Sequence, residues 1–168
     1  MVPWPVVRHA LIWGGILSAI VSVLLLALLW ANAEVMLGDY PPDIRAKFGP
    51  MSARTRRQKL FVSIIGVSVV TVVVTTSFAA VRASSGGDIS FATAFVHLFV
   101  MFSVFNVVDL LLLDWPLVAF VPSFFVLPGT EGMAGYKDYW FHFRGFLIGC
   151  AGILALSALL AGAIAAVF

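Results

Sequence analysis

The sequence has little charge and almost no cysteine. Only 11% of its 168 residues are charged, about half of the roughly 25% found in soluble domains. A soluble globular domain is therefore excluded. Intrinsic disorder is excluded as well, because disordered chains combine low hydrophobicity with high net charge, whereas this chain is 62% hydrophobic with a net charge of +2.

The common sequence signatures of enzymes are also missing. A single cysteine, Cys150, excludes an intramolecular disulfide, a Cys-pair metal site and thiol oxidoreductases that need two cysteines. There is no Gly-x-Ser-x-Gly nucleophile setting, no zincin helix and no P-loop. We therefore expect no catalytic set, cofactor site or metal site. The basic residues flank apolar segments, which indicates membrane orientation rather than nucleic-acid binding.

Long apolar runs are what the sequence has instead. They cover about residues 10–31, 60–81, 91–113 and 145–167, and each matches the length of about 20 residues that crosses the hydrocarbon core. The Val- and Thr-rich run 60–81 would suggest a strand in water, but a lone strand cannot satisfy its backbone in lipid. We therefore expect an all-α polytopic membrane protein, with residues 1–168 forming one four-transmembrane-helix bundle.

One alternative to the first span is a cleavable signal peptide, since Ala31-Asn32-Ala33 has the small-x-small form of a cleavage site. The apolar run is too long for that, because a signal core has only about 7–15 residues. A spanning helix is therefore the better interpretation of this run.

The apolar segment between the third and fourth spans is harder to place. Leu117–Leu127 is too short to cross and contains Pro122, which favours an interfacial or re-entrant segment. Alternatively, the third span runs from about Leu98 to Phe120 with a kink at Pro116, which would move Asp109 from the cytoplasmic third to the bilayer middle.

Basic residues predict the orientation. Eight of the ten lie in the two loops 32–59 and 114–144, so the positive-inside rule places both loops in the cytoplasm and both termini outside the cell inner membrane. The first loop ends in a basic cluster that could also contact anionic lipid headgroups, although orientation alone explains it. This cluster consists of Arg54, Arg56, Arg57 and Lys59.

Ionisable residues inside the membrane are costly and indicate a functional site. Asp109 is the main candidate, with Asn106 one turn earlier on nearly the same face. The pair could bind a cation, relay a proton or hydrogen-bond a neighbouring helix; alternatively, Asp109 pairs with Arg144 or Lys137. In the second span Ser68, Thr71 and Thr75 form a hydroxyl face that either opposes Asp109 or bonds its own helix carbonyls.

The glycine-rich stretch 128–144 adds acid, base and ligand groups on the same predicted side as Asp109, Asp114, Asp39 and Asp43. Its spacing matches no metal or phosphate motif, and its aromatic residues, Tyr136 among them, are typical of an interfacial belt. The candidate polar site comprises Asn106, Asp109, Asp114, Glu131, Lys137, Asp138, His142 and Arg144.

Two further patterns concern helix contacts. A stripe of small residues on the fourth span predicts a packing seam, either within this chain or between copies of it. The stripe consists of Ala151, Ala155, Ala158, Gly162 and Ala166. His9 and His97 are expected at different depths, which argues against paired haem ligands, and we expect His97 to bond a hydroxyl or carbonyl of a facing helix.

Residues 105–115, 128–132, 136–139 and 142–145 resemble segments of small bacterial multi-pass membrane proteins without an established activity. The resemblance covers about a quarter of the chain and implies no substrate. From the residues, we expect a small transport or permease-like protein, or an accessory subunit of a larger membrane complex, with lipid and further copies as partners. The alternative is a membrane enzyme that acts on a lipid through Asp114, Glu131, Asp138 and His142.

Overall fold

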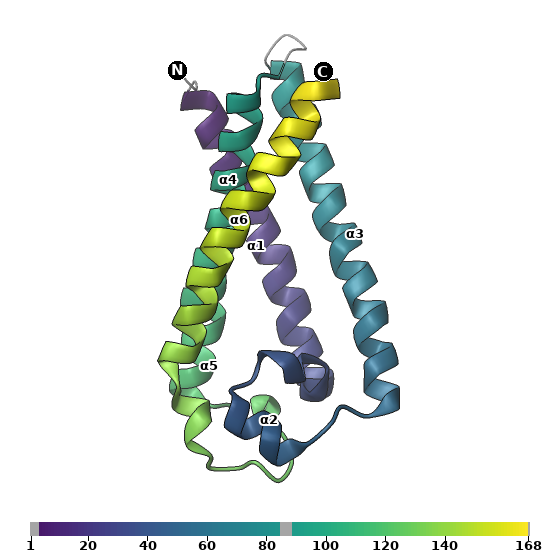
Figure 1. Cartoon of the computed structure of the whole chain (residues 1–168), viewed down its shortest axis with the longest axis vertical. Coiled ribbons are helices and arrows are strands. Elements are labelled where there is room, and N and C mark those ends of the chain that lie inside the picture. The colour runs from purple at the N-terminus through teal and green to yellow at the C-terminus, as the bar shows by residue number, and fades with distance from the viewer. Residues whose placement is uncertain (1–3, 85–88, 168) are drawn as a thin grey trace.

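Four long helices make up most of the structure, a computed structural model that describes residues 4–84 and 89–167 (Figure 1). All four are long and apolar enough to cross a membrane, which confirms the expected all-α, four-span architecture. The spans are formed by α1 (Trp4–Asn32), α3 (Ala53–Ser84), α4 (Phe91–Val108) and α6 (Tyr139–Val167).

The third span continues beyond α4. A π-helical segment, η2 (Asp109–Asp114), and a short helix, α5 (Trp115–Phe120), prolong it without a break. Pro116 lies in the first turn of α5, where its missing N–H is tolerated. Val121, with a left-handed φ of 43°, ends the helix. Residues 117–127 are therefore not one interfacial segment, because the first part belongs to the span.

Close helix packing occurs where side chains are small. α4 packs between α1 and α6, and Leu17, Leu98 and Met101 are almost fully buried at the centre. At Gly14 of α1, an added Cβ would lie only 2.9 Å from both Met101 O and Val104 Cβ. This glycine lets α1 approach the α4 backbone.

The remaining long helix, α3, stands apart from the other three. Its C-terminal half packs against the core through Val73 and neighbouring valines. Towards its N-terminus it diverges from α1, as Figure 1 shows, and it is joined there mainly to the 3-10 segment η1 (Ala33–Asp39).

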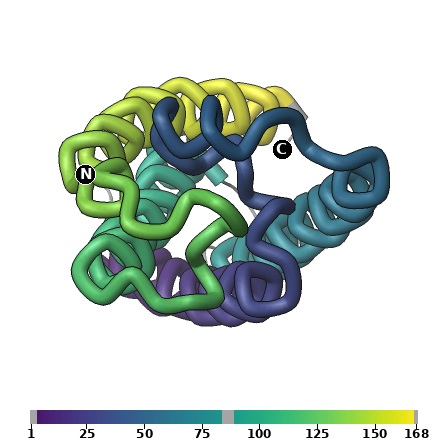
Figure 2. Tube along the Cα trace, turned by 90° about the horizontal axis from the view of Figure 1, so that it is seen from below, coloured from purple at the N-terminus to yellow at the C-terminus, as the bar shows by residue number. Residues whose placement is uncertain are grey.

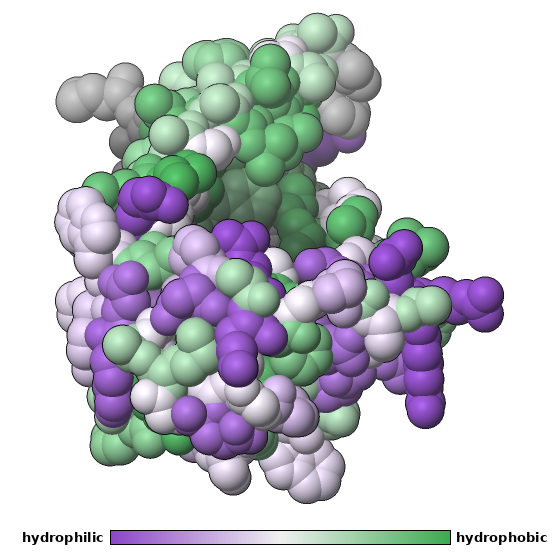
Figure 3. Space-filling model, turned by 60° about the horizontal axis from the view of Figure 1, so that its bottom comes forward, coloured by the Kyte–Doolittle hydropathy of each residue, from purple (hydrophilic) through white to green (hydrophobic). Residues whose placement is uncertain are grey.

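Both termini lie at one end of the bundle, and the loops close the other end as a cap, defined here as residues 33–52 and 121–138 (Figures 1 and 2). The cap contains α2 (Pro42–Phe48), η3 (Ser123–Phe125) and η4 (Ala134–Lys137). Figure 3 shows hydrophilic residues gathered over this end. Three basic residues lie in the cap and five more lie beside it, in the adjacent ends of α3 and α6, and the cytoplasmic location of this end remains a prediction of the positive-inside rule.

The cap has its own buried core, in which Tyr40 stacks on Phe125, Tyr136 packs edge-on against both rings, and Ile44 and Leu127 are buried beside them. Tyr40 Oη donates to Phe125 O at 2.7 Å, and Tyr136 Oη accepts from Leu127 N at 2.9 Å. Burial raises the pKa of the Tyr40 phenol, so this group stays neutral and remains a donor. Tyr136 therefore belongs to the cap core, not to the expected interfacial belt.

The small-residue stripe of α6 does not form the contact with α4. Ala151, Ala155, Gly162 and Ala166 are exposed, and Ala158 is half-buried. The packed face of α6 instead contains Gly149, Ile153 and Ala161. The stripe is therefore not a packing seam within the chain. Association between copies through the stripe stays a prediction.

We expect Gly14→Ala to lower the free energy of unfolding by about 1–3 kcal/mol, because the new methyl group meets backbone and a packed Cβ that cannot easily move. Gly15→Ala is the matched control, since no atom lies within 4 Å of a Cβ built at Gly15. Unfolding of the purified protein in detergent, followed by circular dichroism, measures both. Equal stability of the two variants would contradict the packing described here.

Candidate functional site

The π-helical segment η2 places two carboxylates on one side of the third span. In an α-helix, residues five positions apart differ in direction by about 140°. The wider turn closed by i→i+5 hydrogen bonds reduces this difference in direction. Asp109 and Asp114 begin and end η2, so the irregular turn, a feature often found at functional sites, gathers their charges.

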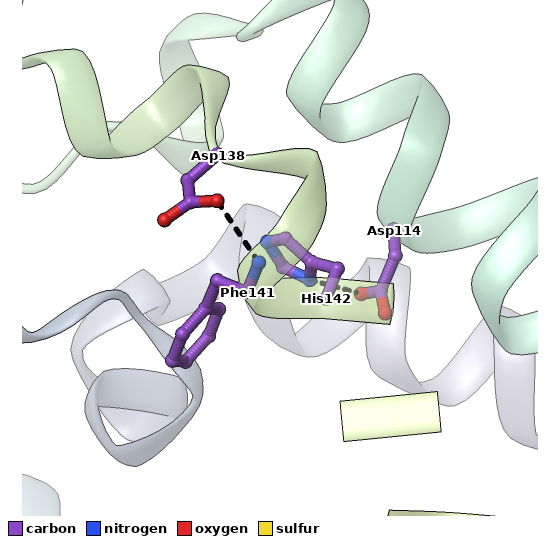
Figure 4. Close-up of polar contacts among 4 residues, drawn as sticks. All are labelled: Asp114, Asp138, Phe141 and His142. Atoms are coloured by element: carbon purple, nitrogen blue, oxygen red, sulfur yellow. Dashed lines mark hydrogen bonds and ion pairs between the residues drawn. The ribbon is translucent and has the colours of Figure 1, made fainter. Parts of the chain in front are cut away.

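The first turn of α6 supplies the imidazole that meets them. His142 is only 9% exposed, and its Nδ1 lies 3.0 Å from Asp114 Oδ1. Among residues 4–84 and 89–167, this is the one ion pair between a carboxylate and a basic side chain. The contact orients the imidazole ring (Figure 4) and fixes which nitrogen faces the carboxylate.

Two cavities meet at these groups. The larger, here called the polar cavity, has a volume of about 340 Å³ and is lined by Asn106 and Arg144 among other residues. A smaller cavity of about 200 Å³ lies towards α1 and the cap core, next to Leu25 and Tyr40. The four ionisable side chains that line both cavities are Asp39, Asp109, Asp114 and His142.

The site has an excess of negative groups. Within the described part of the chain, neither Asp39 nor Asp109 makes a side-chain hydrogen bond or ion pair, and Arg144 lines the polar cavity without pairing to a carboxylate. The alternative in which Asp109 pairs with Arg144 or Lys137 is therefore wrong. Three carboxylates, one imidazole and one guanidinium line the cavity, and this excess of negative groups favours binding of a proton or another cation.

Asn106 ties α4 to α6 at the edge of the polar cavity. Its Nδ2 donates to Phe146 O at 3.1 Å and contacts Cys150 Sγ at 3.4 Å. Gly149 provides the space, because a Cβ there would lie 2.6 Å from Asn106 Oδ1. Of the alternatives considered for Asn106, bonding to a neighbouring helix is what the structure shows.

Three of the candidate residues lie outside the site and serve the local backbone instead. Lys137 Nζ donates to Ala119 O at 2.8 Å, at the C-terminal end of α5. Glu131 is exposed and accepts from Gly129 N at 3.0 Å; backbone N–H groups lower the pKa of this carboxyl. Asp138 Oδ1 accepts from Phe141 N at 2.9 Å and caps α6 (Figure 4).

Asp39 belongs to the site but is not among the candidate residues that the sequence predicts. The sequence predicts the same side of the membrane for Asp39 and for Asp43. Asp43 has a different role, because it accepts from Gly135 N at 3.2 Å. No local pattern separates the two residues. The choice is made by the 3-10 turn η1, which ends at Asp39.

The hydroxyl residues of α3 do not oppose Asp109. Ser68, Thr71 and Thr75 are exposed, and each hydroxyl donates to a carbonyl of its own helix at 2.8 Å. The local alternative is thus confirmed, and no second polar wall comes from α3 at this position.

His9 and His97 lie together rather than at different depths. The ring centroids of His9 and His97 are 5.4 Å apart, because α1 begins at Trp4 and places His9 inside the helix. Trp13 Nε1 donates to His9 Nε2, and Ser77 Oγ lies 3.0 Å from His97 Nε2. The expected hydroxyl partner of His97 is confirmed, while the expected difference in depth is wrong.

No protein-family model, curated protein or solved structure matches the chain. The function is therefore inferred from the chemistry of the site alone.

We expect Asp138→Ala to lower the free energy of unfolding by about 1 kcal/mol, the usual contribution of a helix N-cap. Asp138→Ser should restore most of the stability, because serine also accepts from the backbone at this position. Thermal unfolding in detergent checks both. Equal destabilisation by Ser and Ala would contradict the capping role of Asp138.

Proposed function

We propose that this protein binds a cation in the polar cavity and acts as a small transport or permease-like membrane protein. The cation is a proton or a small metal or organic ion. One observation carries this proposal: Asp39, Asp109 and Asp114 line a single cavity, and among the described residues no cationic side chain forms an ion pair with Asp39 or Asp109. At low dielectric, unpaired carboxylates attract a cation or share protons far more strongly than in water.

The position of the cavity supports the same proposal. The cavity lies at the cap end of the bundle, with Gly38 and Asp39 in its wall, whereas Leu17, Leu98 and Met101 fill the centre of the bundle and are at most 1% exposed. A packed core therefore lies between the cavity and the other end of the bundle, as alternating access requires of a conformation that faces the cap side. By the positive-inside rule that side is the cytoplasm of a bacterial cell.

A single bundle of four helices offers little protein for a complete pathway. The exposed small-residue stripe of α6 is a suitable surface for a second copy, because small side chains allow helix backbones to approach closely. We propose that transport, if the isolated chain performs it, takes place in such a homo-oligomer; an accessory role in a larger membrane complex would use the same surface.

We expect Asp109→Asn and Asp109→Ala to weaken cation binding at least about tenfold, because one charge at about 4 Å contributes several kcal/mol at an effective dielectric constant of 20. Purified protein is titrated with Na⁺, K⁺, Mg²⁺ and Ca²⁺ by calorimetry, and ion and proton flux is followed in reconstituted vesicles. Glu131→Gln is the control, because this carboxylate is exposed and outside the cavity. Unchanged binding and flux in both Asp109 variants would refute the proposal.

A second candidate function rests on the contact between Asp114 and His142. A carboxylate that orients an imidazole is the arrangement of a general base, which could activate water against the headgroup of a lipid. Of the four residues expected for such an enzyme, only these two come together, because Glu131 and Asp138 serve the backbone.

For this alternative we expect vesicles of phosphatidylethanolamine and phosphatidylglycerol to be hydrolysed by the native protein, and His142→Gln to reduce the rate about 100-fold or more. Mass spectrometry of the lipids measures the products. Asp138→Ser, which keeps the cap, should retain the native rate. Lipids that stay intact with the native protein would eliminate the enzyme and leave the cation site unaffected.

A further inference from the structure

The divergence of α3 from α1 leaves a second, apolar cleft, here called the α1–α3 cleft, which shares only Asp39 with the lining of the polar cavity. Its volume is about 640 Å³, within the range of about 300–1,000 Å³ that is typical of ligand sites. Leu24 and Leu28 of α1 face Val62 and Gly66 of α3 across it. The walls are apolar, so the cleft suits a hydrocarbon chain.

The length of the cleft corresponds to one leaflet. Its lining on α3 runs from Lys59 to Val70, a helical rise of roughly 16 Å. Half of a hydrocarbon core of about 30 Å is about 15 Å. A lipid of the leaflet next to the cap therefore fits with its headgroup at Lys59 and its chain along the valines.

Charges of both signs stand at the polar end of the cleft. Lys59 and Asp39 line it together, and Lys59 Nζ lies 3.4 Å from the position of a Cβ built on Gly38. Across the described ranges, the two side chains form no ion pair with each other and no hydrogen bond with other groups. An ammonium and a carboxylate are thus held near one another with space between them.

We propose that the α1–α3 cleft holds one phospholipid whose headgroup carries both a phosphate and an ammonium. Lys59 binds the phosphate, Asp39 binds the ammonium, and one acyl chain lies between α1 and α3. A purely anionic headgroup would place a second negative charge beside Asp39. The exposed Arg54, Arg56 and Arg57 do not line the cleft, so they do not compensate that charge there.

The test uses the full chain reconstituted in vesicles of equal parts phosphatidylethanolamine and phosphatidylglycerol, extracted in mild detergent and weighed by native mass spectrometry. We expect one retained lipid per chain, with phosphatidylethanolamine preferred roughly fivefold, the ratio that corresponds to about 1 kcal/mol per charge. Lys59→Gln should reduce retention of both lipids. Asp39→Asn should remove the preference and leave phosphatidylglycerol retained.

Two glycine variants test the apolar part of the cleft. Gly66→Leu should abolish retention by filling the cleft, since no atom lies within 4 Å of a Cβ built there. Gly152→Leu is the matched control on α6, equally open and outside the cleft, and should retain the lipid. Circular dichroism and melting temperature verify that each variant is folded, and Lys59→Gln carries the test if Gly66→Leu is not.

Several outcomes would overturn the proposal: equal retention of the two lipids by the native chain, retention unchanged in both Lys59→Gln and Gly66→Leu, or a mass of two chains without lipid, which would show that a second copy occupies the cleft. Asp109→Asn separates this proposal from the cation site, because it should leave lipid retention unchanged whether or not it alters cation binding.

Discussion

Hydrocarbon solvates neither a peptide group nor a charge, and every main feature of the structure follows from this constraint. Backbone groups must bond within their own segment, so even a Val-rich run becomes a helix. Charged residues are pushed towards the ends of the spans, where the loops can assemble a cap with its own core around Tyr40 and Tyr136. The few charges that remain at membrane depth are therefore concentrated beneath that cap.

The π-helical turn is where the structure departs from this regularity. A regular helix would direct Asp109 and Asp114 to different sides, whereas η2 brings both to the cavity that His142 and Asp39 complete. Pro116 lies two residues after the end of the turn and provides no N–H to restore the α-helical register. The carboxylates are thus gathered by an irregularity of the backbone, with the imidazole of His142 satisfying only one of them.

Much of the site was predictable, and the exceptions have a common cause. Asp109, Asp114 and His142 carry charge or a titratable ring close to long apolar runs, which is a signal that composition reveals. Glu131 and Asp138 carry equal charge, but nearby backbone N–H groups bind their carboxylates. Whether a loop carboxylate caps a turn or faces a cavity depends on the direction of the chain around it, which spacing does not specify.

The length and polarity of segments are enough to predict that this chain folds in lipid, that it has four spans and that its charge collects at one end. The contacts of Asp39 with the polar cavity and of His9 with His97, and the cleft that α3 leaves beside α1, become apparent only in the folded structure. These are contacts between residues distant in the chain. They depend on how helices cross and where turns direct them, and the local sequence pattern specifies neither.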